Sequence, residues 1–315
     1  MKIGMVFPGQ GSQSVGMLKA YAGLPGIDAV RAEAAAVLGG DFLKLLDDGP
    51  AEQLNLTVNT QPAMVTAAVA AYGAWCALGG PAPAIVAGHS LGEYAALVVA
   101  GALRFADALP LVRFRAQSMQ EAVPEGHGAM AAILGLDDEA ARAACAEAER
   151  GGNAGEAVQA VNFNAPGQVV IAGHKSAVAR AIEACKARGA KRAMPLPVSA
   201  PFHSSLMRPA ADKLEGFLKQ VVFVPPCVPV LNNVDVQIES DPDKIKNALV
   251  RQAASPVRWV EVIRAMAAQG VTHIVECGPG KVLAGLVKRI DPGVQGLAAA
   301  DRASLEQALA TVKGS

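Results

Sequence analysis

The sequence lacks an excess of charge of either sign and has few aromatic side chains. Its 28 basic residues are matched by 28 acidic ones, so no overall field draws the chain to nucleic acid or to an anionic membrane, and we expect neither as a partner. Aromatic residues make up 4% of the chain and hydrophobic residues 52%. A sizeable core can therefore form, and Ala, Val, Leu and Ile must supply most of it.

Cysteines are also few, and no two of them form a CxxC pair. The five are Cys76, Cys145, Cys185, Cys227 and Cys277. Their odd number and wide spacing predict neither a metal site nor a disulfide framework, which favours a reducing compartment. The first residues run directly into a predicted strand rather than through a secretory signal peptide, so we expect a cytoplasmic protein.

One long segment without a charged residue, 53–92, invites comparison with a membrane span. Gly79, Gly80 and Pro81 interrupt it in the middle. The apolar run before that break, residues 62–78, is at the short limit for a span of about 20 residues. We therefore predict a buried helix followed by a buried strand, with no insertion into a membrane.

Strands and helices alternate along most of the chain. Apolar strands are predicted at residues 3–7, 85–87 and 272–277, and each is followed by a glycine-containing turn and a helix. Repetition of strand, glycine turn and helix predicts a parallel sheet with covering helices. The fold class is therefore predicted to be α/β with a parallel-sheet core.

The segment 129–199 has a different pattern. It predicts strands at 129–134, 158–163, 168–172 and 193–198, with helices at 137–150 and 175–188. The order βαββαβ is that of a ferredoxin-like unit. We therefore place an inserted ferredoxin-like α+β subdomain at residues 128–198, with residues 1–127 and 199–315 forming one large α/β domain.

A GxSxG sequence, GHSLG at residues 88–92, lies where a predicted strand passes into a helix. A sharp turn there would lift Ser90 above the edge of the sheet, and the flanking glycines would permit the strained turn and close packing. The next helix would bring backbone N–H groups to a reacting carbonyl, with the N–H of Leu91 as one donor. This context favours a nucleophile over a serine that only begins a helix.

A serine hydroxyl needs a general base at neutral pH. Of the five histidines, His127 and His174 lie in glycine-bounded turns where we expect solvent exposure, and His273 lies inside a strand where we expect core packing. His89 could support the turn or react. His203 lies just after the insertion rejoins the large domain, so it could face a cleft between the two. From the residues alone it is a candidate base, and His89 remains an alternative.

Two arginines, Arg113 and Arg115, lie in a largely apolar helical segment, 109–119. A buried guanidinium needs a partner. It could form an ion pair with a carboxylate such as Glu93, or it could hold a substrate carboxylate through two parallel hydrogen bonds. The spacing alone leaves both possibilities open.

Several separate segments, taken in order, resemble the malonyl-CoA:acyl carrier protein transacylase family and related acyltransferase domains of fatty acid and polyketide synthases. The resemblance covers essentially the whole chain, and it implies a hydrolase-like α/β domain with a ferredoxin-like insertion. The segments that carry it are FPGQGSQ at 7–13, GHSLGE at 88–93, Arg115 with MQEA at 119–122, NFNAPGQ at 162–168, Phe202 with His203, and GPG at 278–280.

The resemblance implies roles for the residues that carry the chemistry. Ser90 matches the nucleophile of the family, and His203 matches its general base. Arg115 matches the arginine that binds the malonyl carboxylate, which leaves Arg113 a structural role.

Further positions complete the implied site. Gln10 and Leu91 match the residues whose backbone N–H groups form the oxyanion hole. Gln252 matches a glutamine whose backbone carbonyl orients the imidazole, so no triad aspartate is expected. Phe202 matches a position where phenylalanine accompanies malonyl rather than methylmalonyl selectivity in multidomain relatives, and its ring would narrow the space beside the malonyl C2. Met119 is expected beside the substrate.

The implied activity is malonyl transfer from malonyl-CoA to the phosphopantetheine thiol of an acyl carrier protein, by a ping-pong mechanism through an ester on Ser90. No metal or redox cofactor is implied. We expect an acidic carrier, a monomeric enzyme and a role in fatty acid synthesis, with polyketide assembly as the alternative. The carrier would dock on one of two basic clusters, unless their charges are merely solvated. The clusters are Arg188, Lys191 and Arg192, and Lys281, Lys288 and Arg289.

Three other functions fit parts of the sequence. A nucleotide-binding loop is suggested by the glycines after the first strand, but Ser14 replaces the third glycine of GxGxxG, and Met17 and Leu18 replace the Lys and Ser/Thr of a P-loop. A serine esterase or thioesterase would share GxSxG, but it would show the order Ser, Asp, His and have no reason for a buried Arg115. A non-catalytic docking module would not need the intact Ser90.

Overall fold

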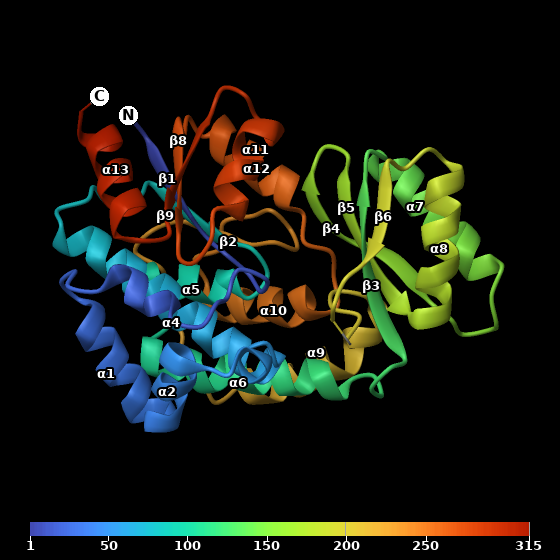
Figure 1. Cartoon of the computed structure of the whole chain (residues 1–315), viewed down its shortest axis with the longest axis horizontal. Helices are drawn as coiled ribbons and strands as arrows, with labels where there is room; N and C mark the ends of the chain where they lie inside the picture. Colours follow the sequence, from blue (N-terminus) through green and yellow to red (C-terminus); the bar gives the residue numbers. More distant parts are fainter. Residues whose placement is uncertain (199, 315) are drawn as a thin grey trace.

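The computed structural model describes residues 1–198 and 200–314. It contains two β-sheets, which are separated along its longest axis (Figure 1). The larger sheet and most helices form one lobe, and the smaller sheet with two helices forms the other.

The larger sheet has the strand order β7-β2-β1-β8-β9, and all neighbouring strands run parallel. Its strands are β1 (Ile3–Phe7), β2 (Ile85–Gly88), β7 (Val230–Leu231), β8 (His273–Cys277) and β9 (Gln295–Ala299). β1 is buried along its length because both faces are covered: Met5 and Phe7 pack into one apolar cluster, and Val6 packs into another. The predicted parallel core is confirmed.

Helices surround this sheet on both faces (Figure 1). They are α1 (Ile27–Leu38), α2 (Gly40–Asp48), α3 (Ala51–Leu54), α4 (Thr57–Ala77), α5 (Gly92–Val99), α6 (Phe105–Glu121), α9 (Arg208–Leu218), α10 (Pro242–Ala253), α11 (Trp259–Ala268), α12 (Val282–Ile290) and α13 (Arg302–Lys313), with short 3-10 helices η1 (Met17–Tyr21) and η2 (Ser205–Met207).

The segment without charge is an interior helix and strand, as predicted. α4 is buried over most of its length and packs against α1, α5 and α6. β2 follows it and lies inside the sheet, between β7 and β1. Within residues 1–198 and 200–314, no helix has the length and apolar character needed to cross a membrane.

The smaller sheet is antiparallel, with the order β4-β5-β3-β6. Its elements are β3 (Gly128–Leu134), α7 (Asp138–Arg150), β4 (Val158–Ala165), β5 (Gln168–His174), α8 (Lys175–Ala187) and β6 (Arg192–Pro195). The ferredoxin-like insertion is thus confirmed. β6 ends earlier than the predicted 193–198 strand because Pro195 and Pro197 have no N–H to donate to the sheet.

The limits of the two domains stay a proposal. We place the insertion at residues 128–198 and the large domain at 1–127 and 199–315. Ser199 and Ser315, the ends of the second segment of the large domain, lie outside the described residues.

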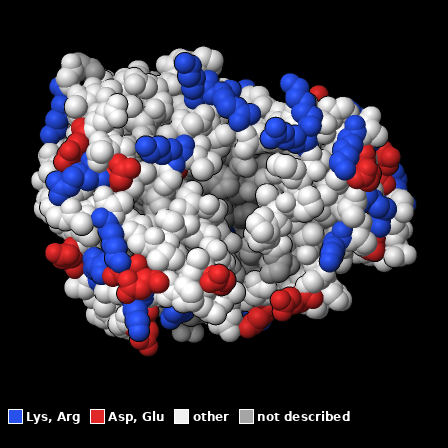
Figure 2. Space-filling model, viewed as in Figure 1, with Lys and Arg blue, Asp and Glu red and all other residues white. Residues whose placement is uncertain are grey.

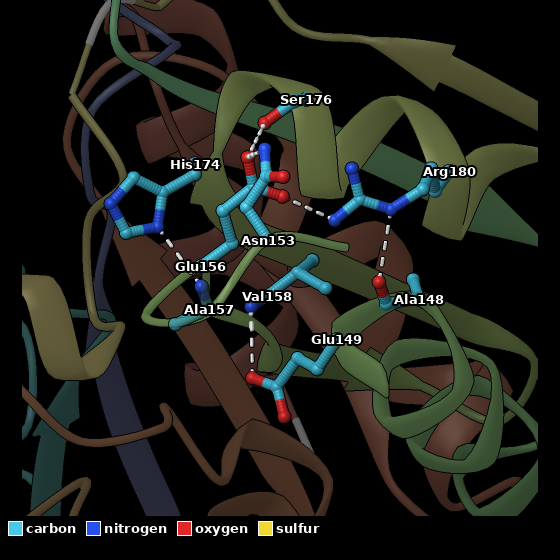
Figure 3. A network of polar contacts seen from close by, with 9 residues as sticks. All are labelled: Ala148, Glu149, Asn153, Glu156, Ala157, Val158, His174, Ser176 and Arg180. Carbon is cyan, nitrogen blue, oxygen red and sulfur yellow. Dashed lines mark hydrogen bonds and ion pairs between the residues drawn. The ribbon is translucent and has the colours of Figure 1, made fainter. Parts of the chain in front are cut away.

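A polar network fixes the loop between α7 and β4 (Figure 3). Glu156 pairs with Arg180 and accepts a hydrogen bond from Ser176 Oγ at 2.8 Å, and these contacts, Arg180 first, lower the pKa of Glu156 to about 2. The N–H of Ala157 donates to His174 Nδ1 at 2.9 Å. His174, the last residue of β5, is therefore half-buried against this loop rather than exposed as we predicted.

The two lobes are tied to each other through β4. The N–H of Val257 donates to the carbonyl of Val161 at 2.8 Å, and the N–H of Phe163 donates to the carbonyl of Val257 at 3.0 Å. α7 and α8 cover one face of the small sheet, and an apolar patch that includes Met130 and Val170 lies on the other. This second face lines the space between the lobes.

Candidate active site

A cavity of about 1120 Å³ lies between the two sheets. Figure 2 shows the surface hollowed between the two lobes. The cavity meets the large sheet where β1 and β2 end, which is the edge at which parallel sheets usually bind ligands. Its lining includes Gln10, Ser90, Leu91, Arg115, Met119, Met130, Asn162, Val170, Leu196, Phe202 and His203.

Ser90 occupies a strained turn between β2 and α5. Its φ of 53° is in the left-handed region, which costs a non-glycine residue about 1–3 kcal/mol. Both flanking glycines are required by close packing. A Cβ on Gly88 would lie 1.9 Å from the carbonyl carbon of Gly92, and a Cβ on Gly92 would lie 2.2 Å from the carbonyl oxygen of Phe7. The predicted strand–turn–helix arrangement is therefore present.

His203 lies within hydrogen-bond distance of the serine. Its Nε2 is 2.6 Å from Ser90 Oγ, and its Nδ1 is 2.9 Å from the backbone carbonyl oxygen of Gln252. A carbonyl can only accept, so Nδ1 carries the proton and Nε2 is free to accept the serine proton. Burial, and next the charge of Arg115, lower the pKa of His203 to about 3. The imidazole is therefore neutral and suited to act as a base.

The other histidines lie elsewhere. His89 Nε2 is 2.8 Å from Asn164 Oδ1 and its ring packs against Trp259, so it supports the turn from below. His127 is exposed, as predicted. His273 is half-buried with Nδ1 2.9 Å from a neighbouring threonine hydroxyl, rather than packed in the core as we predicted.

Arg115 points its guanidinium at the serine. The side chain is 2% exposed; Nη2 donates to Ser90 Oγ at 3.2 Å and Nη1 donates to Gln61 Oε1 at 2.8 Å. Its buried Nε has no partner, and no carboxylate of the described residues forms an ion pair with it. Arg113 is half-buried and does not line the cavity. Of the two possibilities left open by the spacing, the direct ion pair with Glu93 is absent from the described part of the chain.

Gln252 connects the arginine, the histidine and the serine. Besides its backbone contact with His203, its Oε1 accepts from Arg115 Nη2 at 3.0 Å, and its Nε2 donates to the carbonyl of Ser90 at 3.0 Å and to Glu93 Oε2 at 2.9 Å. Glu93 is buried, and burial raises its pKa to about 7. Gln252 thus separates a buried cation from a buried carboxylate.

Two backbone N–H groups remain available to an incoming oxygen. Those of Gln10 and Leu91 border the cavity and donate to no group of the residues that the structure describes. The Gln10 side chain is fixed by Thr57, whose hydroxyl donates to Gln10 Oε1 at 2.8 Å. Leu91 is the N-cap residue of α5, so its N–H lies at the positive end of that helix.

Phe202 and Met119 form an apolar wall beside Ser90 and His203. Met119 is buried in a small cluster with Val123 and Met207, and Phe202 packs against both this cluster and the apolar face of the small sheet. Phe202 therefore narrows the cavity on the side of His203.

Three residues of the site were not predicted from the sequence: Gln61, Asn162 and Asn233. Gln61 is buried in α4, which is largely apolar. A glutamine in such a helix was the one sequence signal that a polar partner lies nearby. Asn162 lines the cavity, and its Oδ1 is buried without a hydrogen-bond partner. Asn233 lies two residues after β7 and contacts the nucleophile turn from there, and no motif marks it.

The arrangement can do nucleophilic acyl transfer on an anionic substrate. It combines a serine with a neutral imidazole, free N–H donors and a buried guanidinium aimed at the same oxygen. Across residues 1–198 and 200–314, no three His, Cys, Asp or Glu side chains gather as a metal site would require.

Comparison with known proteins adds a second line of evidence. A family model described as an acyl transferase domain matches residues 5–302. The malonyl CoA-acyl carrier protein transacylase of Escherichia coli (strain K12) is 60% identical over 286 residues, which are 90% of this chain and 91% of that protein.

Solved structures are also similar to this chain over nearly its whole length. The acyl-carrier-protein S-malonyltransferase of Burkholderia pseudomallei 1710b is 62% identical, with a TM-score of 0.95 over 98% of this chain and 99% of that one. A malonyl-transacylase in complex with its type II PKS acyl-carrier protein is 52% identical, with a TM-score of 0.95 over 99% of this chain and 100% of that one.

Proposed function

Since the chain belongs to the malonyl CoA-acyl carrier protein transacylases of the acyl transferase family, we propose that it moves malonyl groups from malonyl-CoA to an acyl carrier protein through an ester on Ser90. One observation carries the assignment of residues. Ser90 Oγ lies 2.6 Å from His203 Nε2 and 3.2 Å from Arg115 Nη2. The hydroxyl oxygen is therefore within hydrogen-bond distance of both a base and a cation. A malonyl thioester has a carboxylate two bonds from its reacting carbonyl. Ser90, with His203 as its base, can attack the carbonyl while Arg115 binds the carboxylate.

In the first half-reaction Ser90 Oγ attacks the thioester carbon while His203 Nε2 takes its proton. The oxyanion accepts hydrogen bonds from the N–H groups of Gln10 and Leu91. When the tetrahedral intermediate collapses, the carbon–sulfur bond breaks and the departing thiolate takes the proton from His203. Malonyl-Ser90 and free coenzyme A remain.

In the second half-reaction the phosphopantetheine thiol of the carrier enters the emptied cavity. His203 takes its proton, the thiolate attacks the ester carbonyl, and Ser90 leaves with the proton that His203 returns. Arg115 holds the malonyl carboxylate through both halves. We propose no cofactor of the enzyme itself, because residues of this chain supply each proton transfer and each charge.

The cavity walls favour a small acyl group. Phe202 and Met119 line the cavity. We place the malonyl C2 beside the Phe202 ring, where an added methyl group would meet it. We propose that the site prefers malonyl to methylmalonyl groups.

A thioesterase is the main alternative, and the fate of the ester separates the two. We would follow malonyl-CoA with holo carrier protein and without it, and measure malonyl carrier and free malonate. Transfer that greatly exceeds hydrolysis supports the proposal. Hydrolysis that is fast and indifferent to the carrier would replace the proposal with a thioesterase.

The acid limb of the pH profile for acylation is expected near pH 3 rather than near 6.5. Burial and Arg115 lower the pKa of His203 to about 3, so Nε2 accepts the serine proton until the pH falls through that value. The measurement is the second-order rate of acylation at malonyl-CoA concentrations well below KM, which reports the free enzyme. It is made after brief pH jumps, with circular dichroism to show that the protein stays folded. An acid limb near 6.5 would show that the imidazole is not held neutral by its surroundings.

The carrier is proposed to be acidic and to dock beside the cavity. Figure 2 shows basic side chains along the upper rim of the hollow and acidic ones below it. Lys191 and Arg192 are exposed near Met194, a 45% exposed apolar side chain, and Lys281 adjoins Val282, which is 56% exposed. Arg188 pairs with Glu147, so it is less available to a partner.

Charge reversal at the docking cluster is expected to raise the KM for the carrier about tenfold, because each reversed charge weakens a steering interaction. The two double variants are K191E with R192E, and K281E with K288E. Arg289 is kept because it donates to Gln168 of the insertion at 2.6 Å.

Acylation by malonyl-CoA should not change in either double variant, and K219E with K244E is the charge-matched control on another surface. The variant that raises KM identifies the cluster. If neither does, the charges are only solvated.

We further propose a monomer in the cytoplasm. A single chain supplies the base, the oxyanion donors and Arg115, the proposed clamp on the malonyl carboxylate. No second copy is therefore needed to complete the site. The five cysteines are free, as is usual for proteins of a reducing compartment.

Fatty acid synthesis is the pathway proposed. Polyketide assembly is the second candidate, since a 52% identical transacylase is bound to a polyketide carrier. Comparing the two carriers as acceptors decides between them.

A further inference from the structure

The strained turn at Ser90 is bridged by a side chain from the segment that follows a neighbouring strand. β7 is paired with β2 in the register Ala87↔Leu231, so the residues after β7 lie beside the residues after β2. Asn233 Oδ1 accepts from the N–H of Ser90 at 2.7 Å, and Asn233 Nδ2 donates to the carbonyl of Gly88 at 2.7 Å. One amide thus closes the turn on both sides of its central residue.

Asn233 is itself held from the opposite side. The residue is fully buried, and its backbone N–H donates to Glu93 Oε2 at 2.9 Å. The same Glu93 oxygen accepts from Gln252 Nε2, and the carbonyl of Gln252 accepts from His203. One carboxylate therefore links the support of the nucleophile to the support of the base.

The bridge also decides which amide can reach the substrate. The Ser90 N–H is occupied by Asn233, so it is directed away from the oxyanion donors of Gln10 and Leu91. Without the bridge, a buried N–H and a buried carbonyl would lose their partners, and the left-handed turn could relax. Relaxation would move Oγ away from His203.

We propose that Asn233 is a positioning residue for the Ser90 nucleophile: its side-chain amide holds the strained turn in the conformation that brings Oγ to His203. The inference rests on the proposed function only in taking Ser90 as the nucleophile. Asn233 does not touch the substrate, so it acts on the rate of attack and not on binding.

Asn233→Ala is expected to slow acylation on the order of 100-fold with little change in KM for malonyl-CoA, because displacement of a reacting atom by about 1 Å can have that effect. The matched control is Asn232→Ala. Asn232 is the buried neighbour, and its Oδ1 accepts from the N–H of Asp235 without touching the nucleophile turn. The control should lose thermal stability but keep the acylation rate.

Asn233→Asp gives a second readout, the pH dependence of acylation, which would not change if Asn233 only stabilised the fold. A protonated carboxyl group can accept from Ser90 and donate to Gly88 as the amide does, whereas a carboxylate cannot donate. Acylation by this variant should therefore rise as the pH falls, while the wild type does not show the rise.

The charges near the introduced carboxyl group favour this titration. Glu93 and Asp235 are the nearby acids, and Arg115 and Arg258 are the nearby cations; the N–H of Arg258 donates to the carbonyl of Asn233 at 3.3 Å. Burial and the adjacent Glu93 should raise the pKa of the new group. The pH dependence should be absent in Asn232→Asp.

Labelling by a fluorophosphonate separates this inference from the proposed function, since the reagent reports the reactivity of Ser90 without a malonyl group. Slower labelling of Asn233→Ala than of Asn232→Ala supports the positioning role even if malonyl transfer were to fail. Equal labelling and equal acylation of the two alanine variants, with a flat pH profile for Asn233→Asp, would overturn it.

Discussion

Ser90→Ala is expected to lower the rate of malonyl transfer by on the order of a millionfold, which is the scale seen when a serine nucleophile is removed from an enzyme that works through an acyl ester. Alanine leaves His203 and Arg115 in place but removes the atom that lies 2.6 Å from the base. Steady-state transfer to the carrier, measured at saturating malonyl-CoA, gives the size of the loss.

His203→Ala is the informative companion to that variant. If the two residues act as one unit, the double variant should be little slower than either single variant, because their effects are not additive. Losses that multiply in the double variant would mean that the imidazole works apart from the serine, and another base would have to be found.

Arg115→Ala is expected to lower kcat/KM for malonyl-CoA about 1000-fold and that for acetyl-CoA much less, since two charge-assisted hydrogen bonds to a carboxylate contribute about 4 kcal/mol together. The preference for malonyl over acetyl groups should largely disappear. Some loss for both substrates is expected, because Nη2 also contacts Ser90 Oγ at 3.2 Å.

Arg113→Ala is the matched control for the clamp, as it lies on the same helix and does not line the cavity. Arg115→Lys should recover only part of the preference, since an ammonium lacks the planar fork of the guanidinium. A malonyl preference that survives Arg115→Ala in a folded protein would contradict the proposed clamp.

The sequence predicted the parallel sheet and the insertion because their signals are local. β1, β2 and β8 are apolar runs that end at glycine turns, and the insertion follows a regular strand and helix pattern. β7 was missed because it has two residues, and β9 because its sequence QGLAA has little preference for a strand.

The residues of the site also differ in whether a local sequence pattern could predict them. Ser90 lies in a turn whose geometry can be inferred from neighbouring glycines, so the residues alone were enough to propose it as the nucleophile. His203 and Arg115 were candidates among alternatives, and the family resemblance chose between them. The side chain of Gln252 and the bridge by Asn233 could not be found, because each joins residues more than 100 positions apart. Such contacts depend on the packing of strands, which no local pattern records.

The most direct test of the central claim is the intact mass of the protein after brief exposure to malonyl-CoA or acetyl-CoA, followed by peptide mapping. We predict one malonyl group per wild-type chain, carried on Ser90, little label from acetyl-CoA, and none on Ser90→Ala. Wild-type protein that takes up no malonyl group, with no hydrolysis to explain the loss, would contradict the account and leave a carrier-docking module as the function to test.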